Sequence, residues 1–101
     1  MVDPVEGVVV VDKEMALTRA GFFRGIAKAL GTRSYRETES GVVLEQAGRC
    51  LEVSFGPERR RRIALMEIEV MDVRLTFSGY SEKDRKTALS VFDRAFQRGG
   101  G

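Results

Sequence analysis

The chain of 101 residues contains no histidine, one cysteine and two prolines. Without histidine, neither a Ser-His-Asp nor a Cys-His catalytic arrangement is possible, and metal sites built from Cys and His are excluded. The lone cysteine, Cys50, forms no internal disulfide, which fits a reducing cytoplasm. The sequence therefore predicts a cytoplasmic protein that is not an enzyme and that uses no metal and no cofactor.

Long apolar runs and a strong charge imbalance are also missing. Apolar runs such as Val8 to Val11 are far shorter than the ~20 residues of a membrane-spanning helix. The N-terminus, beginning at Met1, has neither the basic nor the apolar region of a signal peptide. Seventeen basic residues stand against fifteen acidic ones, for a net charge of +2. We therefore expect no membrane partner, and attraction to polyanions has to come from local clusters of charge.

Apolar periodicity predicts a strand and then a helix at the start of the chain. The β-branched run from Val5 to Val11 is typical of a strand buried on both faces. Asp12 is then placed to cap a helix that ends at Gly31, with Thr18 as the alternative N-cap. The expected buried face of this helix has apolar residues spaced three and four apart, Ala16, Ala20, Phe23, Ala27 and Leu30, flanked by Phe22 and Ile26.

Three short strands are predicted next, over residues 34–38, 42–46 and 50–55, before the break at Gly56-Pro57. The following segment, Arg59 to Phe77, is too long for one ordinary strand, and its apolar positions change parity. This change indicates either a bulge near Glu67 to Glu69 or two strands that meet there. Ser81 is then expected to cap a final helix whose apolar face is Ala88, Leu89, Phe92, Ala95 and Phe96.

The predicted order is β-α-β-β-β-(β)-β-α. It indicates a two-layer α+β fold, with one mostly antiparallel sheet of five to six strands and two helices packed on one face. Residues 1–97 are expected to form a single domain, with residues 98–101 as a flexible glycine tail. Phe23 and Phe92 are expected to meet Val53 and Val73 in the shared core.

This element order resembles that of the TATA-binding-protein-like (β-α-β4-α) folds. The chain is also similar to short uncharacterised bacterial α+β proteins. Both resemblances imply a fold and no site residues, because folds host many unrelated functions.

The strongest charged feature is the run Arg59-Arg60-Arg61-Arg62. Guanidinium groups that lie close together bind phosphates well, so the run is a candidate nucleic-acid or polyanion site. In an extended strand, however, alternation sends two arginines to each face, and Glu58, Glu67 and Glu69 are near enough to neutralise them. The other interpretation is a solvated strand whose charges protect a sheet edge from aggregation.

Candidate catalytic groups are few. Cys50 lies between Arg49 and Glu52, so its neighbours give no argument for an activated thiolate. Glu67 and Glu69 share a strand face on which Mg²⁺ and water could bind, although such a pair is more typical of a solvated surface.

The sequence therefore favours a small non-enzymatic binding or interaction domain of unknown ligand. The open face of the sheet is the expected partner surface, because Val70, with Met66 and Ile68, is more apolar than a solvated face requires. This predicts either a homodimer through the sheet or an apolar ligand groove between sheet and helix. The alternative is a nucleic-acid-associated protein that binds weakly through Arg59 to Arg62.

Overall fold

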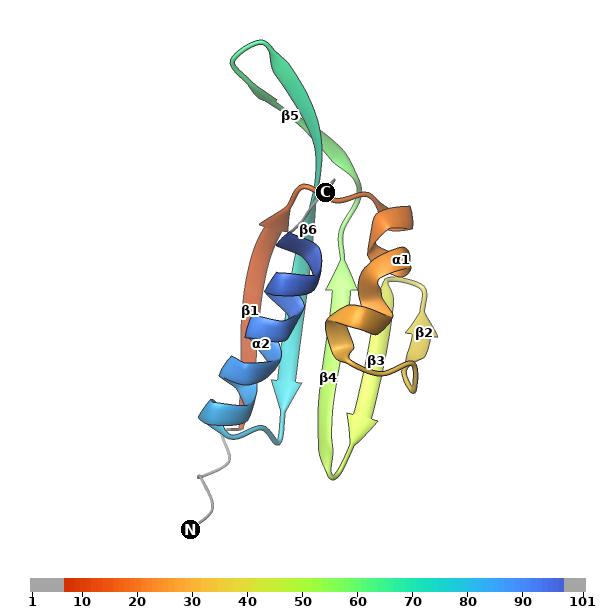
Figure 1. The fold of residues 1–101 in the computed structure, drawn as a ribbon, viewed down its shortest axis with the longest axis vertical. Helices are drawn as coiled ribbons and strands as arrows, with labels where there is room; N and C mark the ends of the chain where they lie inside the picture. Colours follow the sequence, from red (N-terminus) through yellow and green to blue (C-terminus); the bar gives the residue numbers. More distant parts are fainter. Residues whose placement is uncertain (1–6, 98–101) are drawn as a thin grey trace.

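A computed structural model describes residues 7–97 of the chain. Its elements follow the order β1 (Val8–Met15), α1 (Arg19–Leu30), β2 (Arg36–Thr38), β3 (Gly41–Gln46), β4 (Arg49–Phe55), β5 (Arg59–Ile63), β6 (Met66–Ser78) and α2 (Glu82–Gln97) (Figure 1). The α+β prediction is confirmed. The predicted glycine tail, residues 98–101, lies outside the described residues.

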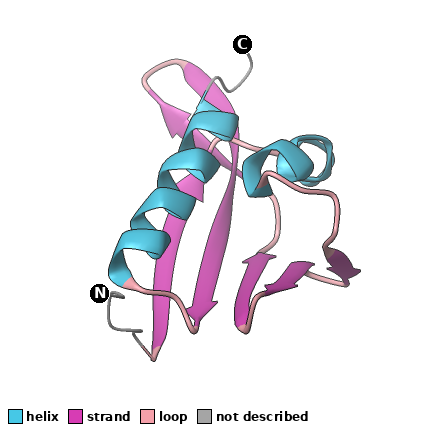
Figure 2. Ribbon diagram, turned by 60° about the horizontal axis from the view of Figure 1, so that its bottom comes forward, coloured by secondary structure: helices cyan, strands magenta, loops and turns pink. Residues whose placement is uncertain are grey.

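The sheet is antiparallel throughout, in the order β1-β6-β4-β3-β2, with β5 paired to β6 alone. Both helices pack on one side of it, as predicted (Figure 2). The core lies between the two layers and is built from alternate strand residues, which point to the same side. It combines Phe22, Ile26, Ala29 and Phe92 from the helices with Val42, Leu51, Val53, Met71, Val73, Leu75 and Phe77 from the sheet.

The first strand continues past its predicted end at Val11 to Met15, whereas its predicted start at Val5 lies outside the described residues. Asp12 does not cap a helix but lies within β1, directly opposite Arg74 of β6. Pairing with β6 overrides the low strand propensity of an aspartate. The alternative cap is the one observed, since Thr18 Oγ1 accepts a hydrogen bond of 3.1 Å from the backbone N–H of Gly21. The predicted burial on both faces is also wrong, because β1 is an edge strand that leaves Val8 exposed.

The buried face of α1 is rotated relative to the predicted one. Phe22 and Ile26 are fully buried, whereas Phe23 is only half-buried and packs edge-on against the ring of Phe22. The helix also starts later than predicted, at Arg19, which leaves Ala16 outside it, and Ala20 is exposed. The expected core of Phe92, Val53 and Val73 is confirmed, but Phe22 takes the place predicted for Phe23.

The final helix follows its prediction. Ser81 Oγ accepts a hydrogen bond of 3.1 Å from the N–H of Asp84, which is the expected cap. Phe92 is buried, and the other four predicted face residues pack against the core.

The long segment after Gly56-Pro57 forms two strands, and they meet at Ala64-Leu65 rather than at Glu67 to Glu69. There is also a bulge, but on the partner strand: residues 56–58 lie opposite only two residues of β6, Met71 and Asp72. The extra residue turns Arg59 to the open face of the sheet. Beyond this bulge, β5 and the first part of β6, residues 59–70, form a hairpin that projects past the other strands, at the top of Figure 1. We call it the arm.

Candidate functional site

The arm separates the four arginines onto two faces. Cross-strand pairing places Arg59 and Arg61 on the same face as Val70 and Ile68. Arg60 and Arg62 lie on the opposite face, across from Glu69 and Glu67 respectively. The run therefore forms no single basic patch, as the alternation of an extended strand predicted.

At the base of the arm, the first arginine face meets carboxylates of the main sheet. Arg59 Nη2 lies 2.7 Å from Glu14 Oε2 and 2.8 Å from Asp72 Oδ1. Arg61 also pairs with Glu14. The hydrogen bond from Arg59 lowers the pKa of the Glu14 carboxyl, and Arg61 lowers it further. Together the two arginines outweigh desolvation, which raises this pKa. These pairs join residues far apart in the chain and fix the arm to β1.

The second arginine face is more exposed. Arg60 and Arg62 each have one nitrogen 3.7 Å from a Glu67 oxygen, a spacing for an ion pair without a hydrogen bond. Glu58, which the sequence placed among the neutralising groups, instead accepts a 2.8 Å hydrogen bond from the backbone N–H of Arg19, at the start of α1. Four carboxylates, Glu14, Glu67, Glu69 and Asp72, thus lie on or beside the arm that carries the four arginines.

The end of the arm is apolar. Leu65 in the turn is fully exposed, and its neighbours Ile63 and Met66 are 54% and 65% exposed. Ile63 and Met66 are cross-strand partners, so their side chains lie on one face, together with half-buried Ile68. Val70, expected on an exposed face, is buried at 2% exposure. The apolar surface expected from residues 66–70 therefore belongs to the tip of the arm and not to the open sheet.

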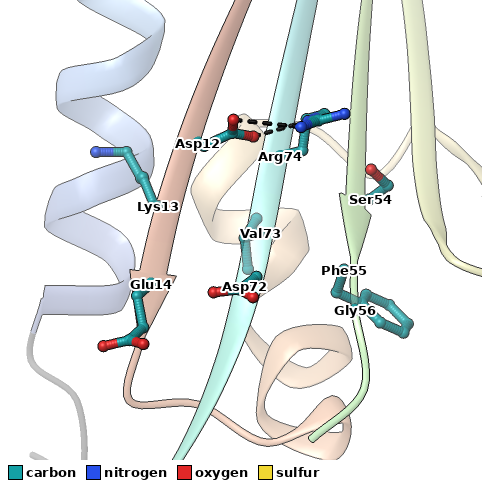
Figure 3. A pocket seen from close by; sticks show the side chains of 9 residues that line it. All are labelled: Asp12, Lys13, Glu14, Ser54, Phe55, Gly56, Asp72, Val73 and Arg74. Atoms are coloured by element: carbon teal, nitrogen blue, oxygen red, sulfur yellow. Dashed lines mark hydrogen bonds and ion pairs between the residues drawn. The ribbon is translucent and has the colours of Figure 1, made fainter.

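The open face of the sheet near the arm is charged. A hollow of about 510 Å³ lies there, lined by nine residues that include Asp12, Glu14, Asp72 and Arg74 (Figure 3). Arg74 Nε donates a 2.7 Å hydrogen bond to Asp12 Oδ1, which lowers the pKa of Asp12 and raises that of Arg74. Within residues 7–97, no group of three or more Cys, Asp or Glu side chains is arranged to hold a metal ion.

A second hollow, of about 330 Å³, opens between the helices and the sheet on the helix side. Its walls are apolar and include Leu44, Leu51, Ala88 and Val91, with the end of α1 closing one side. We call this hollow the groove. The sequence placed a possible ligand groove between sheet and helix on the basis of Val70, Met66 and Ile68, but none of these three residues lines the hollow.

The groove has a polar rim built from distant parts of the chain. Arg49 Nη1 lies 3.1 Å from Asp84 Oδ2, and the Arg49 guanidinium stands 4.6 Å above the ring of Tyr80. Arg49 Nε is buried and has no hydrogen-bond partner among the described residues. Burial raises the pKa of the Tyr80 hydroxyl against the opposing charge of Arg49.

The single cysteine has no activating environment. Cys50 is partly buried in β4, opposite Glu45 and Ser78. Burial raises the pKa of its thiol, and the carboxylates of Glu45 and Glu52 raise it further.

Comparison with known proteins adds no family to these observations: the chain matched no protein-family model, no curated protein and no solved structure at a significant level. Among residues 7–97, no helix is long and apolar enough to cross a membrane. The candidate sites therefore rest on the geometry of the arm and the groove.

Proposed function

We propose that this chain is a small non-enzymatic interaction domain and that the arm is the element that contacts its partner. The observation that carries the proposal is the apolar tip formed by Ile63, Leu65 and Met66 at the end of a projecting hairpin. A two-stranded hairpin without a covering layer is marginally stable in water, and an exposed apolar cluster adds to its free energy. A partner that covers the tip removes that apolar surface from water.

The charges of the arm support a protein partner over a polyanion. Each of the four arginines has a carboxylate within 4.0 Å, and Arg59 and Arg61 are held by Glu14 at the base. Phosphate groups would have to displace these carboxylates from the arginines. The release of counterions from a polyanion would therefore add little net binding free energy. Nucleic-acid binding through Arg59 to Arg62 remains the alternative, and the test below separates it.

The element order supports the TATA-binding-protein-like resemblance as part of this proposal. When β4 and β5, separated only by the bulge at residues 56–58, are counted as one interrupted strand, the order becomes β-α-β4-α. The arm is then an extension of two strands of that fold. A reducing, cytoplasmic location, proposed from the lone Cys50, is compatible with the raised pKa of its thiol.

Site-specific photo-crosslinking in the cells that make the protein tests the proposal. A photo-reactive amino acid replaces Leu65 at the tip and, in a matched control, the exposed Lys83 on α2. We expect a discrete adduct from the tip and none from the control. A nuclease-sensitive adduct would support the nucleic-acid alternative. No adduct above the control at Leu65 would show that the tip contacts nothing and would overturn the proposal.

A further inference from the structure

We propose, on the basis of the interaction role above, that the arm docks into the groove of a second copy of this chain, so that two copies exchange arms. The arm tip is an exposed apolar cluster, and the groove is an apolar hollow large enough for a few aliphatic side chains. The two surfaces therefore match in chemistry and in scale.

The position of the two surfaces prevents a chain from filling its own groove. β4 runs from Arg49, on the rim of the groove, to Phe55, next to the bulge from which the arm extends. Figure 1 shows the arm beyond one end of β4, and Arg49 of the groove rim begins the strand at its other end. Only another copy is able to bring an arm to the groove.

A two-fold axis satisfies both contacts at once. When two copies lie antiparallel, the arm end of each lies beside the groove end of the other. The assembly closes after two copies instead of growing into a filament. One tip contact is small compared with the roughly 800 Å² per partner of a stable interface, so two identical contacts account better for a stable dimer.

The charges beside the two surfaces are complementary. Next to the tip, Arg62 lies opposite Glu67 at a spacing of 3.7 Å, and Arg62 is 75% exposed. The groove rim carries the opposite arrangement in Asp84 and Arg49, with Asp84 half-exposed. Arg62 and Glu67 lie on the face of the arm opposite Ile63 and Met66, so the turn enters the groove end-on, with the apolar face toward the wall and the charged face toward the rim. This brings Arg62 toward Asp84 of the second copy and Glu67 toward its Arg49, and it sets the orientation of the arm.

The edges of the arm disfavour the simpler pairing of two arms side by side. Antiparallel pairing of two β5 edges would place four arginines against four arginines. Pairing of two copies of the β6 segment around Ile68 would place Glu67 against Glu69 of the other copy. Like charges directly opposite each other disfavour pairing of either strand edge, so the apolar tip is the part of the arm that binds the second copy.

Sedimentation and light scattering across a range of concentrations test the dimer, with two variants that break it from opposite sides. Leu65→Asp alters the tip, and Val91→Asp alters the groove wall at a residue that is 38% exposed, so the fold tolerates the change. Each is expected to raise the dimer dissociation constant at least about tenfold. A mixture of the two variants retains one intact arm–groove contact and is expected to associate more tightly than either variant alone.

Disulfide trapping identifies the contact itself. In a Cys50→Ser background, Leu65→Cys and Val91→Cys chains are oxidised separately and together. Arm exchange predicts a bond between the two chains only in the mixture, whereas a Leu65→Cys chain that bonds to itself would indicate tip-to-tip pairing and overturn the inference. A protein that is monomeric at every concentration would also overturn it. In that case, a crosslink from the tip to a different protein would still support the proposed interaction role. The absence of any crosslink would overturn both the interaction role and the arm exchange.

Discussion

Arg59 of the arm and Glu14 of the edge strand β1 are joined by an ion pair of 2.7 Å, although 45 residues separate them in the chain. Arg61 binds the same carboxylate, so Glu14 is the point at which two residues of the arm are held to the main sheet. The bulge at residues 56–58 makes this possible, because it turns Arg59 to the face on which Glu14 lies.

Removal of the Glu14 charge is expected to loosen the arm without unfolding the domain. Glu14→Gln keeps the size of the side chain but leaves Arg59 with Asp72 alone and Arg61 without this partner. We expect faster amide hydrogen exchange in residues 66–70 and little change in melting temperature, since exposed ion pairs contribute little to global stability. Glu82→Gln, which removes a 3.7 Å pair with Lys86 on α2, is the control and should leave exchange in the arm unchanged.

Acid is expected to release the same contact. Because Arg59 and Arg61 lower the pKa of Glu14 in the folded protein, the stabilisation of the arm by the Glu14 carboxylate is fully present above the pKa of an unfolded glutamate. The contribution is lost as the pH falls through the lowered pKa. Amide exchange in the arm, corrected for the intrinsic effect of pH, should therefore stay constant from neutral pH to about pH 5 and rise only in stronger acid. The Glu14→Gln variant should lack this acid transition; the same transition in the variant would assign it to another carboxyl.

The two helices pack closely at Gly25, where an added Cβ would lie 2.7 Å from Cε1 of Phe96. Gly25→Ala gains up to about 1 kcal/mol of helix propensity but forces the Phe96 ring to move, and overpacking of this kind costs about 1–3 kcal/mol. We expect a net loss of stability in urea denaturation. The double variant Gly25→Ala, Phe96→Leu should recover part of the loss, and a fully stable single variant would mean that the ring moves freely.

The two neighbouring phenylalanines of α1 are expected to contribute unequally to the free energy of unfolding. Phe22→Ala and Phe92→Ala each empty a fully buried site and should destabilise the protein by about 3–5 kcal/mol. Phe23→Ala should cost clearly less, because Phe23 is only half-buried. Chemical denaturation measures all three. Equal losses for Phe22 and Phe23 would support the helix face predicted from the sequence over the observed one.

The turn between β3 and β4 offers a stabilising change. Ala47 and Gly48 both have positive φ, 52° and 76°, as a type I′ turn requires, and alanine is disfavoured in that region. Ala47→Asn should therefore raise global stability by about 0.5–1 kcal/mol, measured by thermal and urea unfolding. Ala64→Asn, at a φ of 55° in the turn of the arm, is the comparison: it should slow exchange within the arm and leave the melting temperature unchanged.

Local patterns in the sequence were sufficient for much of the fold. The alternation of Leu51 and Val53 predicted a half-buried strand, and both are buried in β4. The end of α1 at Gly31, with its left-handed φ of 74°, and the cap of α2 at Ser81 also followed from single residues and their neighbours. These features depend on interactions within a few residues, so short-range periodicity and capping preferences determine them.

Other features were decided by contacts between distant residues, which no local pattern contains. Asp12 lies within a strand because it pairs with Arg74 of β6. Phe22, and not Phe23, is fully buried, with its ring packed against Phe55 of β4 and Phe96 of α2. The sequence by itself determined that alternation would divide the four arginines between two faces if the run were extended. Only the tertiary structure decided that Glu14 binds two of these arginines and that the apolar residues beside them form the tip of an arm. It also decided that a groove opens at the opposite end of the sheet. The reason is that side chains from β1, β3, β4 and the helices meet only when the sheet is assembled.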